Sequence, residues 1–261
     1  MCPDPIASAE VRYSLFVAIL NHKLNDETVR MVEGFRPYAE VFAIDSGSEP
    51  EPRHYPYFGR MLPNVHYSGM VNAACEALRD GSDQTLVYLI TSDVRIDAYD
   101  RLIALTKEAF QDPRVGVYAP SVVPGGSIHQ QMIHRSAGGL RRVVWTDGFC
   151  FAMRATVLRR IYPIDTSLNR IGWGIDLYLS YMARRLGMDA VVDDRVIVGH
   201  TPGPNHPDPG RYDADARRQF NAWFESLSPA VRRFRRIALC RPLKGRFGAF
   251  LVRQIPWPGP V

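Results

Sequence analysis

The sequence has no apolar run of about 18 residues or more, and its start lacks the charged, apolar and small-residue succession of a signal peptide. We therefore expect neither a membrane-spanning helix nor secretion by that route, which favours a cytoplasmic protein. Cysteine is scarce too: four residues are scattered over 261 positions, and none forms a C-x-x-C pair. This spacing indicates reduced thiols, with no disulfide framework and no zinc site.

Acidic residues are missing from the end of the chain. None follows Glu225, whereas eight of the 32 Lys and Arg residues lie beyond it. The rest of the chain has 24 basic and 27 acidic residues, so the isoelectric point of about 9.1 belongs to the tail. We therefore expect no nucleic-acid-binding body, but a basic tail that is able to contact an anionic surface.

Apolar segments alternate with helical segments in the first half. The patterns predict strands at residues 14–20, 40–44, 85–90 and 115–119 and a helix capped by Asn25 or Asp26. A loop rich in Pro and Tyr follows residue 48, and further helices are predicted at residues 68–79 and 99–110. This alternation is typical of βαβ units and a mostly parallel sheet. Ligands bind beyond the carboxyl ends of the strands in such sheets. Three polar residues, Asn21, Asp45 and Asp93, occupy those ends.

The second half is less regular. Residues 121–143 lose periodicity and contain four glycines, which predicts a mobile loop. The later patterns predict a strand at 143–151, helices at 155–161, from about 174 and at 213–224, and a proline-rich loop at 201–210. We divide the chain into an extension (1–12), a single domain (13–225, with halves 13–119 and 120–225) and a basic tail (226–261).

Five short motifs follow one another along the chain. They are L-N-H-K from Leu20, D-S-G-S from Asp45, T-S-D from Thr91, W-T-D-G from Trp145 and G-W-G-I-D from Gly172. Their order and spacing resemble those of GT-A fold glycosyltransferases, closest to the family 2 type, over residues 13–200. The resemblance implies an α/β domain of GT-A type, with a nucleotide-binding sheet flanked by helices. It also implies transfer of a sugar from a nucleoside-diphosphate donor.

The resemblance places the nucleotide and a divalent cation near the first three strand ends. Asp45 would accept the imide N–H of uracil, and Asp93 and His200 would hold Mn²⁺ or Mg²⁺. The other implied donor contacts are Asn21, Gly69, Asn72 and Ser92. Thr91 stands where the family has the first acid of its Asp-x-Asp signature. The alternatives are a turn aspartate at 45, a helix-capping aspartate at 93 and a structural histidine at 200.

The resemblance places the acceptor near the last two motifs. Asp176 would be the general base, because a carboxylate must take the proton of the attacking hydroxyl. Asp147, Gly148, Trp173 and Gly174 would contact the acceptor or the sugar. The alternatives are that Asp176 only favours the positive end of its helix and that Asp147 is a turn residue.

These assignments predict an inverting glycosyltransferase acting on a hydroxyl of a saccharide or lipid-linked saccharide, in cell-surface glycan biosynthesis. One alternative, a sugar-phosphate nucleotidyltransferase, should carry a glycine-rich loop after the first strand, and L-N-H-K-L-N-D has no glycine. Another, a catalytically silent nucleotide- or glycan-binding partner, is motivated by Thr91. The cationic and apolar residues of 230–255 predict a peripheral membrane anchor, or a tail that packs on the body.

Overall fold

The computed structural model describes residues 11–52, 57–78, 82–127, 129–136, 138–200 and 209–239. Within these ranges the strands are β1 (Ser14–Asn21), β2 (Glu40–Ser46), β3 (Phe58–Leu62), β4 (Thr85–Thr91), β5 (Val94–Arg95), β6 (Val115–Val122), β7 (Leu140–Val143), β8 (Cys150–Arg154) and β9 (Asp189–His200). The helices are α1 (Asn25–Phe35), α2 (His66–Ala77), α3 (Tyr99–Ala109), α4 (Ala155–Arg159), α5 (Ile175–Arg185), α6 (Pro209–Ser226) and α7 (Pro229–Leu239).

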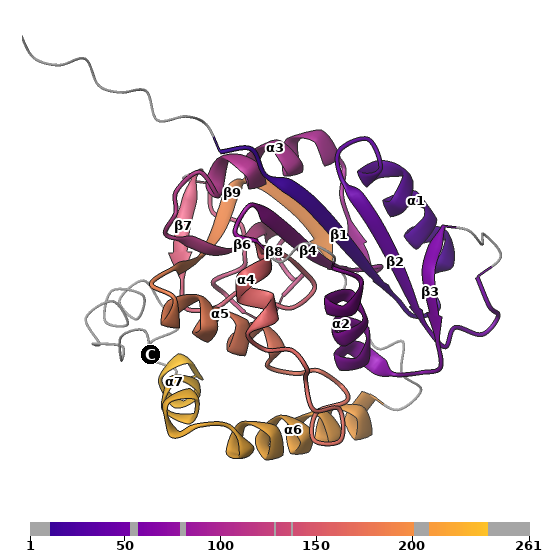
Figure 1. The fold of residues 1–261 in the computed structure, drawn as a ribbon, viewed down its shortest axis with the longest axis vertical. Helices are drawn as coiled ribbons and strands as arrows, with labels where there is room; N and C mark the ends of the chain where they lie inside the picture. The colour runs from indigo at the N-terminus through magenta and orange to yellow at the C-terminus, as the bar shows by residue number, and fades with distance from the viewer. Residues whose placement is uncertain are drawn as a thin grey trace, which may run out of the picture.

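The strands form one sheet in the order β3-β2-β1-β4-β8-β6-β9-β5, with β7 paired to β9. Helices α1 and α3 cover one face, and α2, α4 and α5 cover the other (Figure 1). Seven of the eight residues of β1 are buried, as its continuous apolar run predicts for a strand covered on both faces. The predicted α/β fold is confirmed.

The first half follows the prediction closely. Strands β1 and β2, β1 and β4, and β2 and β3 pair in parallel, so their carboxyl ends lie at one edge of the sheet. Helix α1 begins after Leu24 without a side-chain cap, so Asn25 and Asp26 are not its caps. Helix α2 begins two residues before Ser68, which therefore lies inside its first turn. Strand β3 occupies part of the segment that was expected to be a loop.

The second half differs from the prediction. Residues 121–143 do not form one loop, because β6 continues to Val122 and β7 begins at Leu140. The single strand predicted at 143–151 is also wrong: β7 ends at Val143, and β8 begins at Cys150. These elements form because they pair with strands that are distant in the sequence. The long strand β9 supplies hydrogen-bond partners to both β6 and β7, and β8 inserts antiparallel between β4 and β6.

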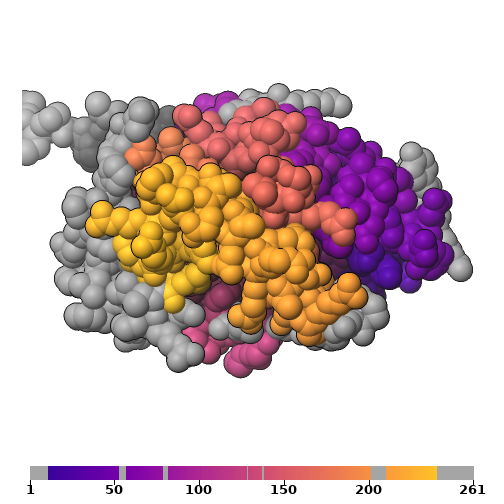
Figure 2. Space-filling view, turned by 90° about the horizontal axis from the view of Figure 1, so that it is seen from below, coloured from indigo at the N-terminus to yellow at the C-terminus, as the bar shows by residue number. Residues whose placement is uncertain are grey.

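The packed core extends beyond residue 225. Helix α7 buries Val231, Phe234 and Ala238, and the Phe234 ring lies 5.4 Å from that of Tyr181 on α5. Helices α6 and α7 lie side by side across the lower face of the molecule (Figure 2). The anchor prediction is therefore wrong for Val231 and Phe234, whose apolar groups are buried inside the domain, and the packing alternative is confirmed for residues 229–239.

The remaining parts of the predicted tail (240–261) and most of the predicted extension (1–10) lie outside the described residues. No helix in the described part of the chain is both long and apolar enough to cross a bilayer.

Candidate active site

The polar residues at the ends of β1, β2 and β4 meet in a buried hydrogen-bond network. The Asn21 amide donates to Asp45 Oδ1 at 2.7 Å, and Asn21 Oδ1 accepts from Ser92 Oγ at 3.2 Å. Asp45 also accepts from the backbone N–H of Ser48 at 3.0 Å and from its hydroxyl. These are the bonds of an aspartate that closes a turn. The nucleobase contact of Asp45 stays a prediction, and a ligand would have to compete with these internal partners.

Helix α2 contributes two residues that were predicted to contact the donor. An added Cβ on Gly69 would lie 2.5 Å from Val65 Cβ, so the glycine permits close packing of the helix start. The Asn72 amide donates to Ile164 O at 2.9 Å, and its oxygen accepts from Ile164 N at 2.8 Å. Both ends of the Asn72 side chain therefore join α2 to the segment after α4. Donor contact by either residue stays a prediction.

Asp93 and His200 face each other where β5 pairs with the end of β9. Asp93 Oδ2 lies 3.4 Å from His200 Nε2, and the two side chains are 32% and 12% exposed. His200 Nδ1 bonds Gly126 O at 2.6 Å, and the imidazole stacks on Phe149 with ring centroids 4.0 Å apart. Because a carbonyl accepts a hydrogen bond from Nδ1, the proton of the neutral ring lies there. Nε2 carries a proton, and can donate it to Asp93, only when the ring is cationic.

The electrostatics of this pair favour two opposite charges. Burial opposes ionisation of Asp93, but the hydrogen bond and charge of His200, together with Thr91, outweigh it and lower the Asp93 pKa. Burial likewise opposes protonation of His200, but Asp93 outweighs it and raises the His200 pKa. The Thr91 hydroxyl donates to Asp93 Oδ1 at 2.5 Å. Thr91 therefore orients the carboxylate and does not replace the missing acid with a second charge.

A carboxylate oxygen and an imidazole nitrogen form a donor set that suits a divalent cation, with some preference for Mn²⁺ over Mg²⁺. The hydrogen bond from Nδ1 to Gly126 is the outer contact that usually orients a ligating histidine. Among the described residues, no group of three His, Cys, Asp or Glu side chains lies close enough to hold a metal ion. These two residues would supply only part of the coordination of such a cation, and their metal role stays a prediction.

The last two motifs come together beside this pair. An added Cβ on Gly148 would lie 3.8 Å from Asp176 Cβ and Cγ, so Gly148 contacts the first turn of α5. The adjacent Asp147 carboxylate accepts from Ser127 Oγ at 2.6 Å. The backbone N–H of Thr91 donates to Phe149 O at 2.9 Å, which ties the turn to the end of β4. The structure thus brings Asp147 and Asp176 to the edge of the sheet that carries Asp93.

The two acceptor-side carboxylates interact. Burial, followed by the negative charge of Asp147, raises the pKa of Asp176 to about 8. Burial and the charges of Asp176, Asp147 and Asp93 also raise the pKa of the Tyr67 hydroxyl. The charges of all three carboxylates therefore act on the pKa of one hydroxyl. Asp93 on the predicted cation side and Asp147 and Asp176 on the predicted acceptor side thus lie near the same phenol.

The Gly-Trp-Gly turn is held by helix α6. Gly174 has φ +86, and an added Cβ there would lie 2.5 Å from Phe220 Cε2, so the position requires glycine. Trp173 is partly buried, and the guanidinium carbon of Arg217 lies 5.8 Å from its ring centroid. One face of this ring is thus shared with a cation, and its role as a sugar platform stays a prediction.

Several residues of the site were not predicted, namely Tyr67, Gly126, Ser127, Phe149 and Arg217. Their contacts join residues that are far apart in the sequence. The bond between Tyr67 and Gly148 spans 81 positions, and that between Gly126 and His200 spans 74. No local pattern marks such residues. Only the position of Tyr67 next to the suspected helix start gave any signal.

No protein-family model and no curated protein sequence matches the chain. Its structure is similar to that of GalNAc-T7 with UDP, GalNAc and Mn²⁺, with a TM-score of 0.57 and 14% identity. The match covers 95% of this chain and 52% of that one, so this chain spans about half the length of GalNAc-T7.

The structure is also similar to glucosyl-3-phosphoglycerate synthase from Mycobacterium tuberculosis in complex with phosphoglyceric acid. The TM-score is 0.55 and the identity 16%, over 82% of this chain and 79% of that one. A second structure of that synthase, with Mn²⁺, UDP and glucosyl-3-phosphoglycerate, gives a TM-score of 0.54. The chain has the GT-A fold, and at these identities the similarity shows the fold alone.

Proposed function

We propose that this protein is a glycosyltransferase that moves a sugar from a nucleoside-diphosphate donor to a hydroxyl of a saccharide or lipid-linked saccharide, with inversion, in cell-surface glycan biosynthesis. One observation carries the proposal. The carboxylate–imidazole pair Asp93 and His200 and the carboxylate pair Asp147 and Asp176 gather at one edge of a GT-A sheet. Similar structures that contain UDP with Mn²⁺ or Mg²⁺ support a nucleotide donor and a divalent cation.

The donor side is assigned to Asp93 and His200. These two residues would hold Mn²⁺ or Mg²⁺, which when bound neutralises the charge that develops on the leaving diphosphate. Gly126 fixes the tautomer and orientation of His200, and Thr91 fixes the carboxylate of Asp93. These contacts arrange both groups before the donor arrives, so less ordering is needed when it binds.

The acceptor side is assigned to Asp176 and Asp147. Asp176 takes the proton of the acceptor hydroxyl as its oxygen bonds to the anomeric carbon and the diphosphate leaves from the opposite face. A base works best when its pKa lies near the working pH, and burial beside Asp147 moves the Asp176 pKa in that direction. Asp147, oriented by Ser127, would accept hydrogen bonds from sugar hydroxyls.

A donor screen tests the proposal. Nucleoside-diphosphate sugars are scored by thermal shift with and without Mn²⁺, and positive donors are then assayed for hydrolysis and transfer. The anomeric configuration of the product, read by NMR, tests inversion. Asp93→Asn should abolish the Mn²⁺-dependent shift, while Asp97→Asn, an exposed neighbour, should leave it unchanged.

Three results would overturn the proposal. No stabilisation by any donor would argue against nucleotide-sugar binding. Binding without hydrolysis or transfer would favour the silent binding partner. Release of pyrophosphate from a nucleoside triphosphate and a sugar phosphate would identify a nucleotidyltransferase.

The proposal includes contact with an anionic membrane surface, where a lipid-linked acceptor would lie. Because α7 buries its apolar residues, this contact would be electrostatic, through exposed cations such as Arg233 and Arg236. Each cation near such a surface contributes about 1 kcal/mol, and salt weakens the effect. Co-sedimentation with anionic vesicles at low and high salt tests the contact. If the full chain and its Arg233→Gln/Arg236→Gln variant bind the vesicles equally, α7 does not take part in the membrane contact.

A further inference from the structure

We infer that Tyr67 is a positioning residue for the proposed base: it holds the Asp147–Gly148 turn and the Gly172–Asp176 segment against each other. The inference rests on the proposed function, because it concerns the same site. It assigns Tyr67 no contact with substrate and no proton transfer. Tyr67 acts only through the two segments that carry the acceptor-side carboxylates.

Tyr67 contacts both segments directly. Its hydroxyl donates to Gly148 O at 2.5 Å and lies 3.5 Å from the place of a Cβ on Gly148. On the other segment, a Cβ on Gly172 would lie 2.6 Å from Tyr67 Cδ1. The phenol ring thus packs on the Gly172 backbone, at a distance that only glycine permits. The same side chain bonds one segment and packs on the other, so moving either segment breaks one of these contacts.

Tyr67 is itself held in place by its neighbours at the start of α2. The N–H groups of Val65 and His66 donate to Ser46 Oγ at 3.0 and 3.1 Å, which ties the helix start to the end of β2. The N–H of Ser68 donates to Arg170 O at 3.3 Å, two residues before Gly172. The backbone around Tyr67 is therefore fixed by its own hydrogen bonds. The orientation of the side chain does not depend only on its contacts with the two segments.

The hydroxyl also keeps its proton under working conditions. Burial, and after it the charges of Asp176, Asp147 and Asp93, raises the Tyr67 pKa well above its ordinary value. A neutral phenol is a hydrogen-bond donor, so the bond to Gly148 O persists at the pH values at which a transferase would be assayed. Tyr67 therefore remains a neutral hydrogen-bond donor to Gly148 and does not titrate in this pH range.

This arrangement predicts a particular kinetic defect. A displacement of about 1 Å between reacting groups can cost about 10²-fold in rate. Tyr67→Phe removes only the hydroxyl and keeps the ring on Gly172, so we expect a smaller loss of about tenfold in transfer turnover. Tyr67 makes no hydrogen bond to Asp93 or His200 among the described contacts. The affinity for the nucleoside diphosphate with Mn²⁺ should therefore stay within about twofold of that of the wild type.

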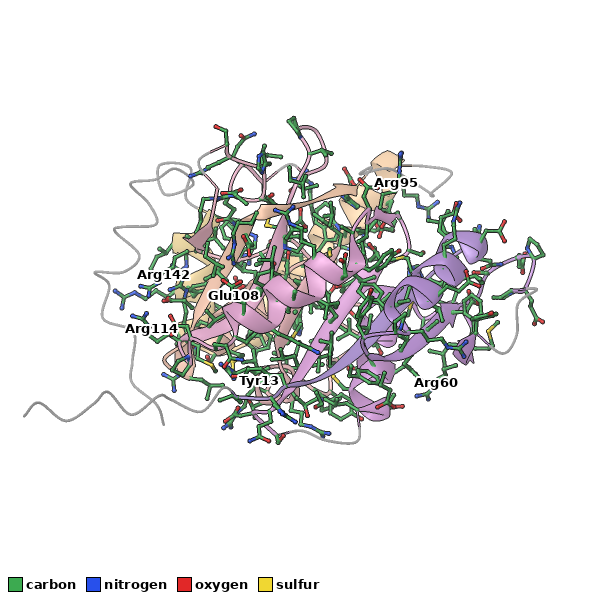
Figure 3. All side chains as sticks on the ribbon, turned by 90° about the horizontal axis from the view of Figure 1, so that it is seen from above. Tyr13, Arg60, Arg95, Glu108, Arg114 and Arg142 are labelled. Atoms are coloured by element: carbon green, nitrogen blue, oxygen red, sulfur yellow. The ribbon has the colours of Figure 1, made fainter. Side chains whose placement is uncertain are left out.

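Tyr13→Phe is the matched control. Tyr13 also donates its hydroxyl to a backbone carbonyl, Phe110 O, at 2.6 Å. Figure 3 shows it at the opposite edge of the molecule from Arg95, which lies two residues after Asp93. Loss of this hydroxyl should leave transfer turnover unchanged.

A double-mutant cycle separates positioning from general weakening of the fold. If Tyr67 acts through Asp176, then Tyr67→Phe should have less than about a twofold effect on turnover when Asp176 is already asparagine. A full tenfold loss on both backgrounds would overturn the inference. Wild-type turnover in the single variant Tyr67→Phe would overturn it as well.

Hydrogen–deuterium exchange of the full chain without substrate gives a readout independent of activity. In Tyr67→Phe, peptides covering residues 144–151 should exchange about five- to tenfold faster than in the wild type. In Tyr67→Ala, which also removes the ring from Gly172, peptides covering residues 169–178 should exchange faster as well, and in Tyr13→Phe neither segment should change. Unchanged exchange in either segment would overturn the inference. If the wild type binds no nucleotide sugar but both segments exchange faster in the Tyr67 variants, the proposed function is wrong. The structural role of Tyr67 between the two segments would still be supported.

Discussion

Replacing Asp176 by asparagine should make the protein more stable at neutral pH, although it removes the residue that we propose as the base. In the folded protein, burial and the charge of Asp147 raise the Asp176 pKa to about 8. In the unfolded chain the pKa returns to about 3.9. Between these values the folded protein binds a proton that the unfolded chain has released. Its free energy of unfolding therefore falls as the pH rises.

The size of the effect follows from one proton. The free energy of unfolding falls by about 1.4 kcal/mol per pH unit for each proton that only the folded state binds. Between pH 5 and pH 7 the wild type should thus lose about 3 kcal/mol relative to Asp176→Asn. The difference should become small and constant below about pH 3, where Asp176 is neutral in both the folded and the unfolded chain, and it should level off above about pH 9. Asparagine keeps an oxygen that can accept the N–H of Leu177, as Asp176 Oδ1 does at 2.7 Å.

The assay is urea unfolding of both proteins from pH 4.5 to 8.5, in the presence of a chelator. All other titrating groups are common to the two proteins, so they largely cancel in the difference. Asp147→Asn tests the cause of the shift, because it removes the neighbouring charge and should lower the Asp176 pKa. On this background, the stability difference caused by Asp176→Asn should level off at a lower pH than in the wild type. Parallel pH curves for the wild type and Asp176→Asn would show that Asp176 is ionised at neutral pH, which would refute the reasoning.

The same Asp176→Asn variant should lower transfer turnover by about 10² or more while donor affinity is retained; steady-state turnover within severalfold of the wild type would instead leave Asp176 as a helix-terminus residue. Phe234→Ala should lower the free energy of unfolding by about 3–5 kcal/mol, because the ring is fully buried, and Arg233→Ala should change it little. Equal urea midpoints for these two variants would contradict the place of α7 in the core. Gly172→Ala should lower both thermal stability and turnover, since its φ is +94 and the Tyr67 ring fills the space of a Cβ.

The local patterns in the first half located most of its elements, although they missed the short strands β3 and β5. The apolar run of β1 and the segment of α3 lie close to where their sequences predicted them. Each depends mainly on the periodicity of its own residues. Polar residues directly after such strands also located Asn21, Asp45 and Asp93 at the same edge of the sheet.

The second half could not be predicted in the same way. Residues 121–143 show no periodicity of their own, and β7 exists because β9 pairs with it. The turn at 146–149 was taken for part of a strand, although Phe149 ends beside Thr91 and stacks on His200. Sheet pairing between distant segments overrides weak local preference, which is why these elements were wrong.

The sequence by itself determined the chemical inventory of the candidate site: a carboxylate after β4, a histidine at the end of β9 and two further carboxylates in short glycine-containing motifs. Only the tertiary structure decided which of these groups share one neighbourhood. It did so by inserting β8 between β4 and β6, which places Asp147 near Asp176 and Phe149 against His200. The raised pKa of Asp176 and the link through Tyr67 are consequences of that packing. Burial and nearby charges shift a pKa, and both arise only when the chain folds, so the sequence around a single residue does not predict them.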